Sequence, residues 1–495
     1  MKKRIFALLL AALMASSVIA CASDNPGTTD TTASPDADTT PSADTTPAET
    51  ELTPDLPDVR FDGTELIIIH NPAVQNYYYE PWIYAENITG DIINDAVYKR
   101  NLTVENKYGV KIVSIEDTNP ANTAGLASQA QSDEYDLAMC KISHVGTIAP
   151  KGMLHNIADL PYVNYDNPWW DSNVVDGLTI NGKLYGMVSD ISMMTLSGVR
   201  GVLFNRDLVT DYNLDDPYDL VKSGKWTLDK MAEMTLAVSA DLNGDTVYDN
   251  NDRFGMLTEV SNNIKNFVLA SGINLTTVDA EGNIEIAFMN EKTINVIEKC
   301  RSFLLDPIKC IDYSTLKNMT SESVYNYGRK LFAANQFLFT QGGAMLFDEL
   351  NAANMESEYG IVPNPKFDEN QEKYYHCPDV NTSMVTIPSA NTTEDLERLG
   401  VLLEALAYES HKTTYPAYYE TIIKLRRAVV PELGEMMDII KGSINYEISD
   451  QYGIDTVTVI NQAFNTGSIT AAFDAGEKAI TLKLKQLSEK LAELP

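Results

Sequence analysis

Apolar residues gather in short continuous runs along the chain, and these runs predict buried strands. Leu66–Ile69 follows an Asp-Gly pair, and Val110–Ile115 and Tyr135–Cys140 continue the pattern. Val199–Phe204 and Ala344–Phe347 extend it further along the chain. A short apolar run bounded by polar residues is typical of a strand that is buried on both faces, as in a parallel sheet. The chain is therefore expected to contain several parallel strands.

Between these runs lie segments whose apolar residues have the spacing of a helix. Apolar residues recur on one side of segment 91–108, and Gly109 is well placed to end that helix. Segment 391–395 offers capping groups for another helix. The last helix is expected to dock on the body through an apolar stripe, formed by Ile480, Leu484, Leu487, Leu491 and Leu494. The strand–helix–strand order predicts an α/β fold.

The N-terminus has the layout of an exported protein. Basic residues 2–4 precede an apolar run over residues 5–20, which at about 16 residues is short for a bilayer span of roughly 20. Cys21 follows small residues, and Val18–Cys21 resembles a bacterial lipoprotein cleavage site. We expect a signal peptide at 1–20 and a lipid anchor on Cys21, at the outer face of the bacterial cytoplasmic membrane. The alternative is an ordinary signal peptide with an incidental cysteine.

Residues 21–60 are expected to form a disordered linker. Residues 22–59 hold nine acidic side chains and no Lys or Arg, and few large apolar ones. Such a segment cannot bury enough apolar surface to offset its ordering entropy. The whole chain has a net charge of −33, which argues against nucleic-acid binding because phosphate contacts need basic patches.

The folded part from about residue 61 is long enough for two or three lobes. It contains four cysteines: Cys140, Cys300, Cys310 and Cys377. The sequence is compatible with a Cys300–Cys310 disulfide and equally with four buried free thiols. The spacing of the cysteines and histidines matches no zinc motif.

Several segments resemble the sugar-type extracellular solute-binding proteins that serve ABC importers. Asn167–Asp171 leads into Asn181–Gly186, and Leu203–Leu208 has a strand–Asn–Arg pattern. Gly224–Asp229 is similar to the opening of the second lobe's first helix, and Gly342–Met345 with Tyr359–Pro365 resembles the return to the first lobe. The order of these segments carries the resemblance, because no single one is highly specific.

The resemblance implies a two-lobe fold of the periplasmic-binding-protein type II. Each lobe would have a central, mainly parallel sheet flanked by helices. Lobe one would hold 61–200 and 384–445, and lobe two would hold 201–383 and 446–495. A monomeric chain would close by hinge motion over a small solute, most simply a sugar or oligosaccharide, and deliver it to a membrane permease.

Strand ends and the resemblance together select the candidate ligand contacts. In open α/β sheets, ligands bind beyond the carboxyl ends of strands. Aromatic plates and hydrogen-bonding side chains suit sugars, and the loop after Ile69 is rich in them, including Tyr77–Tyr79. The expected contacts, each with packing, turn or hinge roles as the alternative, are Trp82, Tyr84, Ser143, His144, Asp190, Ser192, Phe347, Asp348, Asp379 and Asn381.

Segment 241–252 has the spacing of an EF-hand-type calcium loop. Oxygen ligands would come from Asp241, Asn243, Asp245, the Val247 carbonyl, Asp249 and Asp252. Two positions depart from the pattern: Thr246 stands where glycine is usual, and Asp252 stands where glutamate is usual. The prediction is a structural calcium ion, with no cofactor required for function. The alternative is an Asx-rich turn whose side chains cap its own backbone.

The competing functional class is a secreted carbohydrate-active hydrolase with a pair of carboxylates. The chain has 70 acidic residues, so acidic pairs are plentiful. It has no GxSxG, HExxH or GxxxxGK[ST] motif, and its five histidines show no ligand spacing. We therefore expect a binding protein and not an enzyme.

Overall fold

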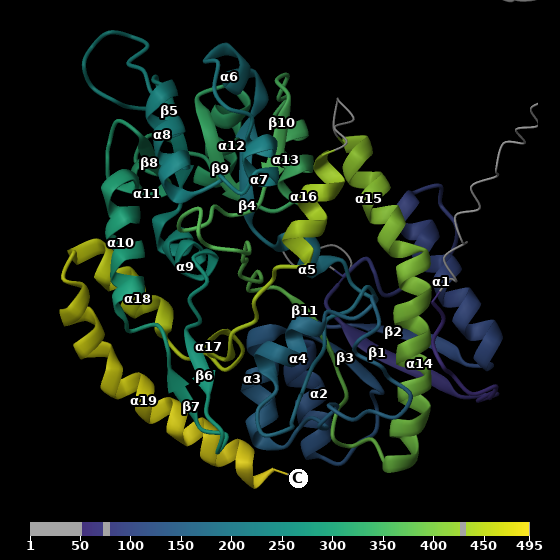
Figure 1. The fold of residues 1–495 in the computed structure, drawn as a ribbon. Coiled ribbons are helices and arrows are strands. Elements are labelled where there is room, and N and C mark those ends of the chain that lie inside the picture. Colours follow the sequence, from purple (N-terminus) through teal and green to yellow (C-terminus); the bar gives the residue numbers. More distant parts are fainter. Residues whose placement is uncertain (1–51, 73–79, 426–431, 495) are drawn as a thin grey trace, which may run out of the picture. The chain divides into compact units, whose positions relative to one another are not determined.

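The protein is described by a computed structural model that covers residues 52–72, 80–425 and 432–494. Contacts group the described residues from Thr53 onward as one unit. The predicted signal peptide, Cys21 and Tyr77–Tyr79 lie outside the described residues. Two sheets organise the described part, and we call the elements around each of them the first and the second lobe (Figure 1).

The first lobe is built on a four-stranded sheet with the order β11-β3-β1-β2. Three strands are parallel, and β11 runs antiparallel to β3. The apolar run predicted near Leu66 forms the centre of this sheet, where Leu66 and Ile69 are fully buried. The strands are β1 (Glu65–His70), β2 (Lys111–Glu116), β3 (Leu137–Lys141) and β11 (Ser383–Thr386).

The second lobe is built on a five-stranded sheet with the order β10-β4-β9-β5-β8. Strand β4 pairs antiparallel with β10 and β9, whereas β5 pairs parallel with β9 and β8. These strands are β4 (Gly201–Asn205), β5 (Phe254–Thr258), β8 (Cys310–Asp312), β9 (Phe337–Gly342) and β10 (Tyr359–Val362). A separate antiparallel hairpin consists of β6 (Thr276–Val278) and β7 (Ile284–Ile286).

Helices cover both sheets, as the α/β prediction requires (Figure 1). Those preceding β4 are α1 (Ile92–Tyr108), α2 (Pro120–Gln129), α3 (Ile142–Ile148), the 3₁₀ turn η1 (Ala149–Lys151), α4 (Ser172–Leu178) and α5 (Met194–Gly198). Those between β4 and β11 are α6 (Arg206–Asp211), α7 (Pro217–Lys222), α8 (Leu228–Val238), α9 (Val260–Ala270), α10 (Glu291–Leu304), α11 (Tyr313–Leu316), α12 (Val324–Ala333) and α13 (Leu346–Ala352). Those after β11 are α14 (Thr393–Lys412), α15 (Thr414–Leu425), α16 (Glu432–Lys441), α17 (Ile448–Gln451), α18 (Thr456–Thr466) and α19 (Ile469–Glu493).

The predicted helix ends are confirmed by their capping geometry. Asp91 caps α1 through the backbone N–H of Asn94, and Gly109 ends that helix with φ +71°. At α14, Thr392 and Asp395 form a reciprocal capping box. These local hydrogen bonds satisfy N–H groups that a helix cannot pair internally, so the boundaries follow directly from sequence.

The C-terminal helix α19 docks on the body as its apolar stripe predicts. Ile480, Leu484 and Leu491 are buried, and the helix packs along α18 and β7. The start of the folded part differs from the predicted boundary at residue 61. Leu56 and Val59 pack against the core, so ordered contacts begin a few residues earlier.

The prediction of a strand at Ala344–Phe347 is wrong. Strand β9 ends at Gly342, and α13 begins at Leu346. At Gly343 the backbone lies so close to another segment that an added Cβ would be 2.4 Å from the carbonyl oxygen of Ser197. The chain turns at this close approach instead of continuing the ladder. A four-residue apolar run does not distinguish a strand from the first turn of a buried helix.

All four cysteines of the described part are free and buried, so no Cys300–Cys310 disulfide is present. Burial raises the pKa of the Cys140 thiol to about 12 and that of the Cys300 thiol still further. No helix in the described residues combines the length and apolarity that crossing a bilayer requires.

Candidate ligand-binding site

A pocket of about 340 Å³ lies at the carboxyl ends of strands in the second sheet. Glu259 follows β5, Tyr313 follows β8, and Gly342–Gly343 ends β9. The segments that connect the two lobes also reach this pocket, through Arg200 and through residues 379–381. We call it the strand-end pocket. Its volume lies within the range of about 300–1,000 Å³ that is usual for small-molecule sites.

Two tyrosines form the aromatic part of the strand-end pocket. The rings of Tyr313 and Tyr325 lie 5.1 Å apart at their centroids, with a tilt of 44°. The Tyr325 hydroxyl donates a hydrogen bond of 2.7 Å to Glu259 Oε1. Burial raises the pKa of the Tyr313 hydroxyl, so this ring stays neutral. The pocket therefore offers apolar ring faces next to fixed polar groups.

Arg200 links two acidic side chains of this pocket, Glu259 and Asp379. Its guanidinium lies 3.4 Å from Glu259 Oε2 and 4.0 Å from Asp379 Oδ2. The side chains of Glu259 and Asp379 are only 17% and 12% exposed. Arg200 precedes β4, and Asp379 lies between β10 and β11, on residues 363–382, which we call the return segment. This group of charges therefore joins both connections between the lobes.

A second ion pair closes another side of the pocket. Arg329 on α12 contacts the carboxylate of Glu349 on α13. Burial raises the pKa of Glu349, and the charge of Arg329 acts in the opposite direction. Each buried carboxylate of the pocket thus has a cationic partner, which is the arrangement that partly buried charges require.

Small residues keep this pocket open. A Cβ at Gly342 would lie 2.1 Å from Leu346 Cδ1, and one at Gly198 would lie 3.0 Å from Asp379 Cβ. Side chains at either position would press on groups that line the pocket. The Gly342-Gly343 pair therefore lets the end of β9 approach the connecting segments.

Two of the predicted contacts, Asp379 and Asn381, line the strand-end pocket. Asn381 donates to Asp379 Oδ1 from its backbone N–H at 3.0 Å and from its side-chain amide at 2.6 Å. The two residues form one turn, with the Asp379 carboxylate turned to Arg200 as well. This position is compatible with either role expected of them, ligand contact or hinge residue.

Phe347 and Asp348 lie on α13 next to this pocket but do not line it. Phe347 is fully buried and meets the Tyr359 ring edge-on, with 5.5 Å between the centroids. Burial raises the pKa of Asp348. Their neighbours Leu346 and Glu349 line the pocket in their place, because this segment is helical and not extended.

Asp190 and Ser192 belong to a buried polar group in the first lobe. Asp190 accepts from His411 Nδ1 at 2.6 Å and pairs with Lys441 Nζ at 2.9 Å. Ser192 Oγ donates to the buried carboxylate of Glu80 at 2.8 Å. Both residues line a small cavity of about 20 Å³. Their geometry fixes the packing of α14 and α16 against the 186–196 segment.

Trp82 and Tyr84 also lie away from the strand-end pocket. Trp82 is 5% exposed and meets Tyr418 edge-on at 5.7 Å, while its indole N–H has no partner among the described residues. Tyr84 is exposed and lines a surface hollow beside α1. Tyr77–Tyr79 lie outside the described residues.

Ser143 and His144 occupy the first turn of α3, directly beyond the carboxyl end of β3. Burial and the charge of Lys141 lower the pKa of His144, and its Nδ1 has no partner among the described residues. Lys141 itself lies within electrostatic reach of Asp379, whose charge partly offsets the effect of burial on the pKa of Lys141. The strand end of the first sheet thus approaches the return segment of the strand-end pocket.

The predicted calcium loop is held by its own backbone. The Asp241 carboxylate accepts from Gly244 and Thr246 N–H at 2.7 and 2.8 Å, and Asp252 accepts from Leu242 and Asp249 N–H. Thr246, at the position where the pattern has glycine, adopts φ +68°. Within the described residues, no group of three or more His, Cys, Asp or Glu side chains is placed to hold a metal.

Most residues of the strand-end pocket are absent from the contacts predicted from sequence: Arg200, Glu259, Tyr313, Tyr325, Arg329 and Glu349. Glu259 and Tyr313 directly follow strands, so the strand-end rule would have selected them. The sequence pattern, however, predicts no strand at β5 or β8. Strand β8 has only three residues, which is too short for periodicity to detect.

A family model described as bacterial extracellular solute-binding protein matches residues 99–396, which is more than half of the chain. Among curated proteins, none matches the sequence. Solved structures show the same fold at low identity. A cyclic α-maltosyl-1,6-maltose binding protein from Arthrobacter globiformis has a TM-score of 0.56 and 12% identity, and the match covers 86% of this chain and 99% of that one.

Two further structures agree with this fold. An ABC substrate-binding protein from Listeria monocytogenes in complex with cycloalternan has a TM-score of 0.53 and 13% identity, with 86% of this chain and 99% of that chain covered. A cyclo/maltodextrin-binding protein complexed with maltotetraose has a TM-score of 0.52 and 15% identity, with 87% and 97% covered. The predicted two-lobe α/β architecture is thereby confirmed.

Proposed function

Because the chain belongs to the bacterial extracellular solute-binding proteins, a family of non-enzymatic receptors, we propose that its solute is a sugar or an oligosaccharide held in the strand-end pocket. The family membership sets aside the alternative of a secreted hydrolase. The three solved structures compared above bind or contain oligosaccharides according to their descriptions, which supports this choice of solute.

The observation that carries the proposal is the tyrosine pair beside the charged groups of the pocket. A sugar ring presents C–H faces that pack on aromatic rings, and hydroxyl edges that both donate and accept hydrogen bonds. Tyr313 and Tyr325 supply the ring faces, with 5.1 Å between their centroids. Arg200, Glu259 and Asp379 supply donors and acceptors that are already held in place by one another. Little ordering entropy is then lost when a ligand binds.

The position of these groups also allows a bound solute to contact both lobes. Arg200 and Asp379 lie on the two segments that run between the sheets, and Lys141 lies at a strand end of the first lobe. A solute that contacts groups of both lobes stabilises the closed form, because a ligand shifts such an equilibrium only through its differential affinity. The closed protein would then deliver the solute to an ABC permease.

Calorimetric titration of the protein with mono- and oligosaccharides tests the proposal. At least one sugar should bind saturably, and Tyr313→Ala should weaken that binding by roughly tenfold or more, since ring packing contributes about 0.5–1.5 kcal/mol beyond the buried area. Arg200→Met should also weaken binding, because it removes a donor and leaves two carboxylates without their cation.

Tyr212→Ala is the matched control, because Tyr212 is an exposed tyrosine outside the strand-end pocket. It should bind sugar like the unchanged protein. Binding of every sugar at unchanged affinity by Tyr313→Ala would refute the assignment of this pocket. Saturable binding of an amino acid or peptide, with no response to sugars, would refute the proposed class of solute.

We also propose that Cys21 carries a lipid anchor, on the support of the cleavage-site pattern in the sequence. In bacterial cells that express the whole chain, the protein should partition with the membrane fraction, and Cys21→Ser should release it to the soluble or secreted fraction. Equal partitioning of both proteins would contradict the anchor.

A structural calcium ion in the 241–252 loop remains a proposal. The left-handed backbone of Thr246 and the burial of Asp252 support a loop shaped like a calcium site. The hydrogen bonds within the loop support the alternative, in which the Asx side chains alone hold the turn. Chelation distinguishes these two cases.

A further inference from the structure

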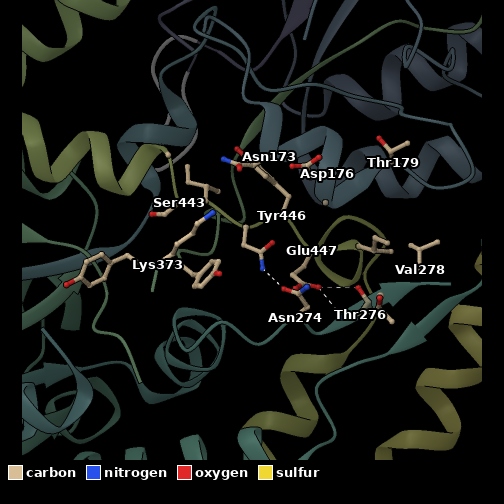
Figure 2. A pocket seen from close by; sticks show the side chains of 18 of the residues that line it. Asn173, Asp176, Thr179, Asn274, Thr276, Val278, Lys373, Ser443, Tyr446 and Glu447 are labelled. Carbon is tan, nitrogen blue, oxygen red and sulfur yellow. Dashed lines mark hydrogen bonds between the residues drawn. The ribbon is translucent and has the colours of Figure 1, made fainter. Parts of the chain in front are cut away.

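A second and larger cavity, of about 660 Å³, lies between elements of the two lobes (Figure 2). We call it the interlobe groove. It shares no lining residue with the strand-end pocket. Its first two walls come from α4 with the residue that follows it, and from β6 with the residues just before it. The other two come from the return segment, and from the end of α16 with the segment that follows it. The corresponding lining residues are within 173–179, 274–278, 372–375 and 439–448.

The walls of the groove are held together by specific contacts. Tyr446 donates to Asp171 Oδ2 at 2.7 Å, beside the start of α4. A Cβ at Gly177 would lie 2.3 Å from the Tyr446 carbonyl oxygen, so α4 packs directly on this segment. Glu447 accepts from the backbone N–H of Leu275 and Thr276 at 2.9 and 3.2 Å. Figure 2 shows Tyr446 and Glu447 between the two walls. The groove is therefore a preformed feature of the fold.

Hydroxyl and amide groups dominate the lining of the groove. Asn445 Nδ2 donates to Asn274 Oδ1 at 3.0 Å across it. Thr179 Oγ1 is buried and has no hydrogen-bond partner among the described residues. A buried hydroxyl without a partner costs free energy that a ligand hydroxyl could recover. Such groups suit a ligand that donates and accepts at many points.

An aromatic ring stands beside these polar groups. Tyr375 lines the groove and is partly buried. One edge of its ring lies 3.1 Å from the position that a Cβ at Gly272 would take. The glycine thus leaves room for the ring at this wall. An aromatic face next to amides and hydroxyls is the same combination that favours sugars in the strand-end pocket.

The charges of the groove exclude several other ligand classes. Asp176, Glu372 and Glu447 are acidic, and Lys373 is the basic residue that opposes them. An anionic ligand would therefore meet net repulsion. Metal binding is not supported either, because the described residues contain no group of three or more acidic, His or Cys side chains placed for it. The polar walls also disfavour a wholly apolar ligand.

We propose that the interlobe groove is a second binding site, for a neutral polyhydroxylated molecule of the saccharide class. Tyr375 would pack on its C–H face, and Thr179, Asn274 and Asn445 would exchange hydrogen bonds with its hydroxyls. The proposal does not depend on which solute the strand-end pocket takes.

Methyl-group NMR of the whole chain tests this site directly. Maltotetraose, trehalose and sorbitol are titrated while the methyl signals of Thr276 and Val278 are followed. At least one of these probes should shift the signals saturably. Thr277→Trp, at an exposed position of the groove wall, should fill the groove and weaken this binding by roughly tenfold or more, a loss of at least about 1.4 kcal/mol. Asn274→Trp, at another exposed position, serves as a second occluding variant.

The control Thr466→Trp places the same substitution at an exposed threonine outside both cavities, and it should leave the titration unchanged. Tyr313→Ala separates the two sites. Retained groove binding in that variant supports a second site, whatever becomes of the strand-end pocket. Absence of a saturable shift with all three probes overturns the inference, as does a shift that survives both occluding variants. A shift that disappears in Tyr313→Ala also overturns it.

Discussion

The buried carboxylate of Glu447 should make the stability of this protein depend on pH in a specific direction. Its side chain ties the segment after α16 to the start of β6 through the N–H groups of Leu275 and Thr276. The residue is 3% exposed, and burial raises the pKa of Glu447 from 4.5 to about 7. The backbone donors lower this pKa and the charge of Asp450 raises it, but burial is the largest effect.

The sign follows from linkage. The folded state binds the proton more tightly than the unfolded state, so folding is favoured when Glu447 is protonated. The contribution of Glu447 to stability is therefore fully present below pH 4.5 and is lost as the pH rises to about 7. At about 1.4 kcal/mol for each tenfold change in proton affinity, the difference between 4.5 and about 7 corresponds to roughly 3 kcal/mol.

Glu447→Gln removes the titrating group and nearly keeps its shape. Other carboxylates also titrate over this range, so the informative quantity is the difference in free energy of unfolding between the two proteins. We expect this difference to change by roughly 3 kcal/mol, against the unchanged protein, as the pH rises from below 4.5 to above 7. The offset at any one pH also contains the altered hydrogen bonds of the amide.

Urea unfolding at several pH values, followed by both tryptophan fluorescence and circular dichroism, measures this difference. Coincident transitions of the two probes are needed for a two-state free energy. Glu285→Gln, at an exposed position on β7, is the matched control and should give a flat difference. A Glu447→Gln difference that stays constant to within about 0.5 kcal/mol across the range would contradict a raised pKa of Glu447 in the folded protein.

Three other changes test the structure. Lys265→Met should lower the free energy of unfolding, measured by chemical denaturation, by about 3–5 kcal/mol, because it leaves Asp450 partly buried without its cation. A decrease below about 1 kcal/mol would show that water replaces the ion pair. Gly343→Ala should lower both the melting temperature and the affinity for solute, since its Cβ would overlap the carbonyl oxygen of Ser197, and the idea fails if neither value changes. Chelation with EDTA should lower the melting temperature if the 241–252 loop holds calcium, and added calcium should restore it. An unchanged melting temperature in both steps would leave the Asx-rich turn as the correct description.

The elements that the sequence predicted correctly share one property: their signals are local. The apolar run at Leu66–Ile69 became the central strand β1, and Gly109 ended α1 in the left-handed conformation. The capping box at Thr392 fixed the start of α14. Each of these depends on residues within a few positions of one another. Where a signal was weak, as for the three-residue strand β8 or the apolar turn before α13, the prediction failed or was not made.

The candidate site was predicted only in part. Asp379 and Asn381 were expected near a crossing between lobes, and both line the strand-end pocket. Asp190 was also expected to face the cleft, but the structure pairs it with His411 and Lys441. Nothing in the sequence near residue 190 indicates those partners, because they lie on helices that follow more than two hundred residues later.

Periodicity and capping act over short distances, so the α/β class and the order of the family-like segments can be read from the amino-acid sequence alone. The N-terminal export pattern was likewise readable from the sequence. Which side chains meet in the pocket depends on the three-dimensional packing. Arg200, Glu259 and Asp379 are far apart along the chain, yet they form one group of charges beside Tyr313. They come together because of how β4, β5, β8 and the return segment pack against one another. The identity of each residue does not indicate which distant residues will become its neighbours.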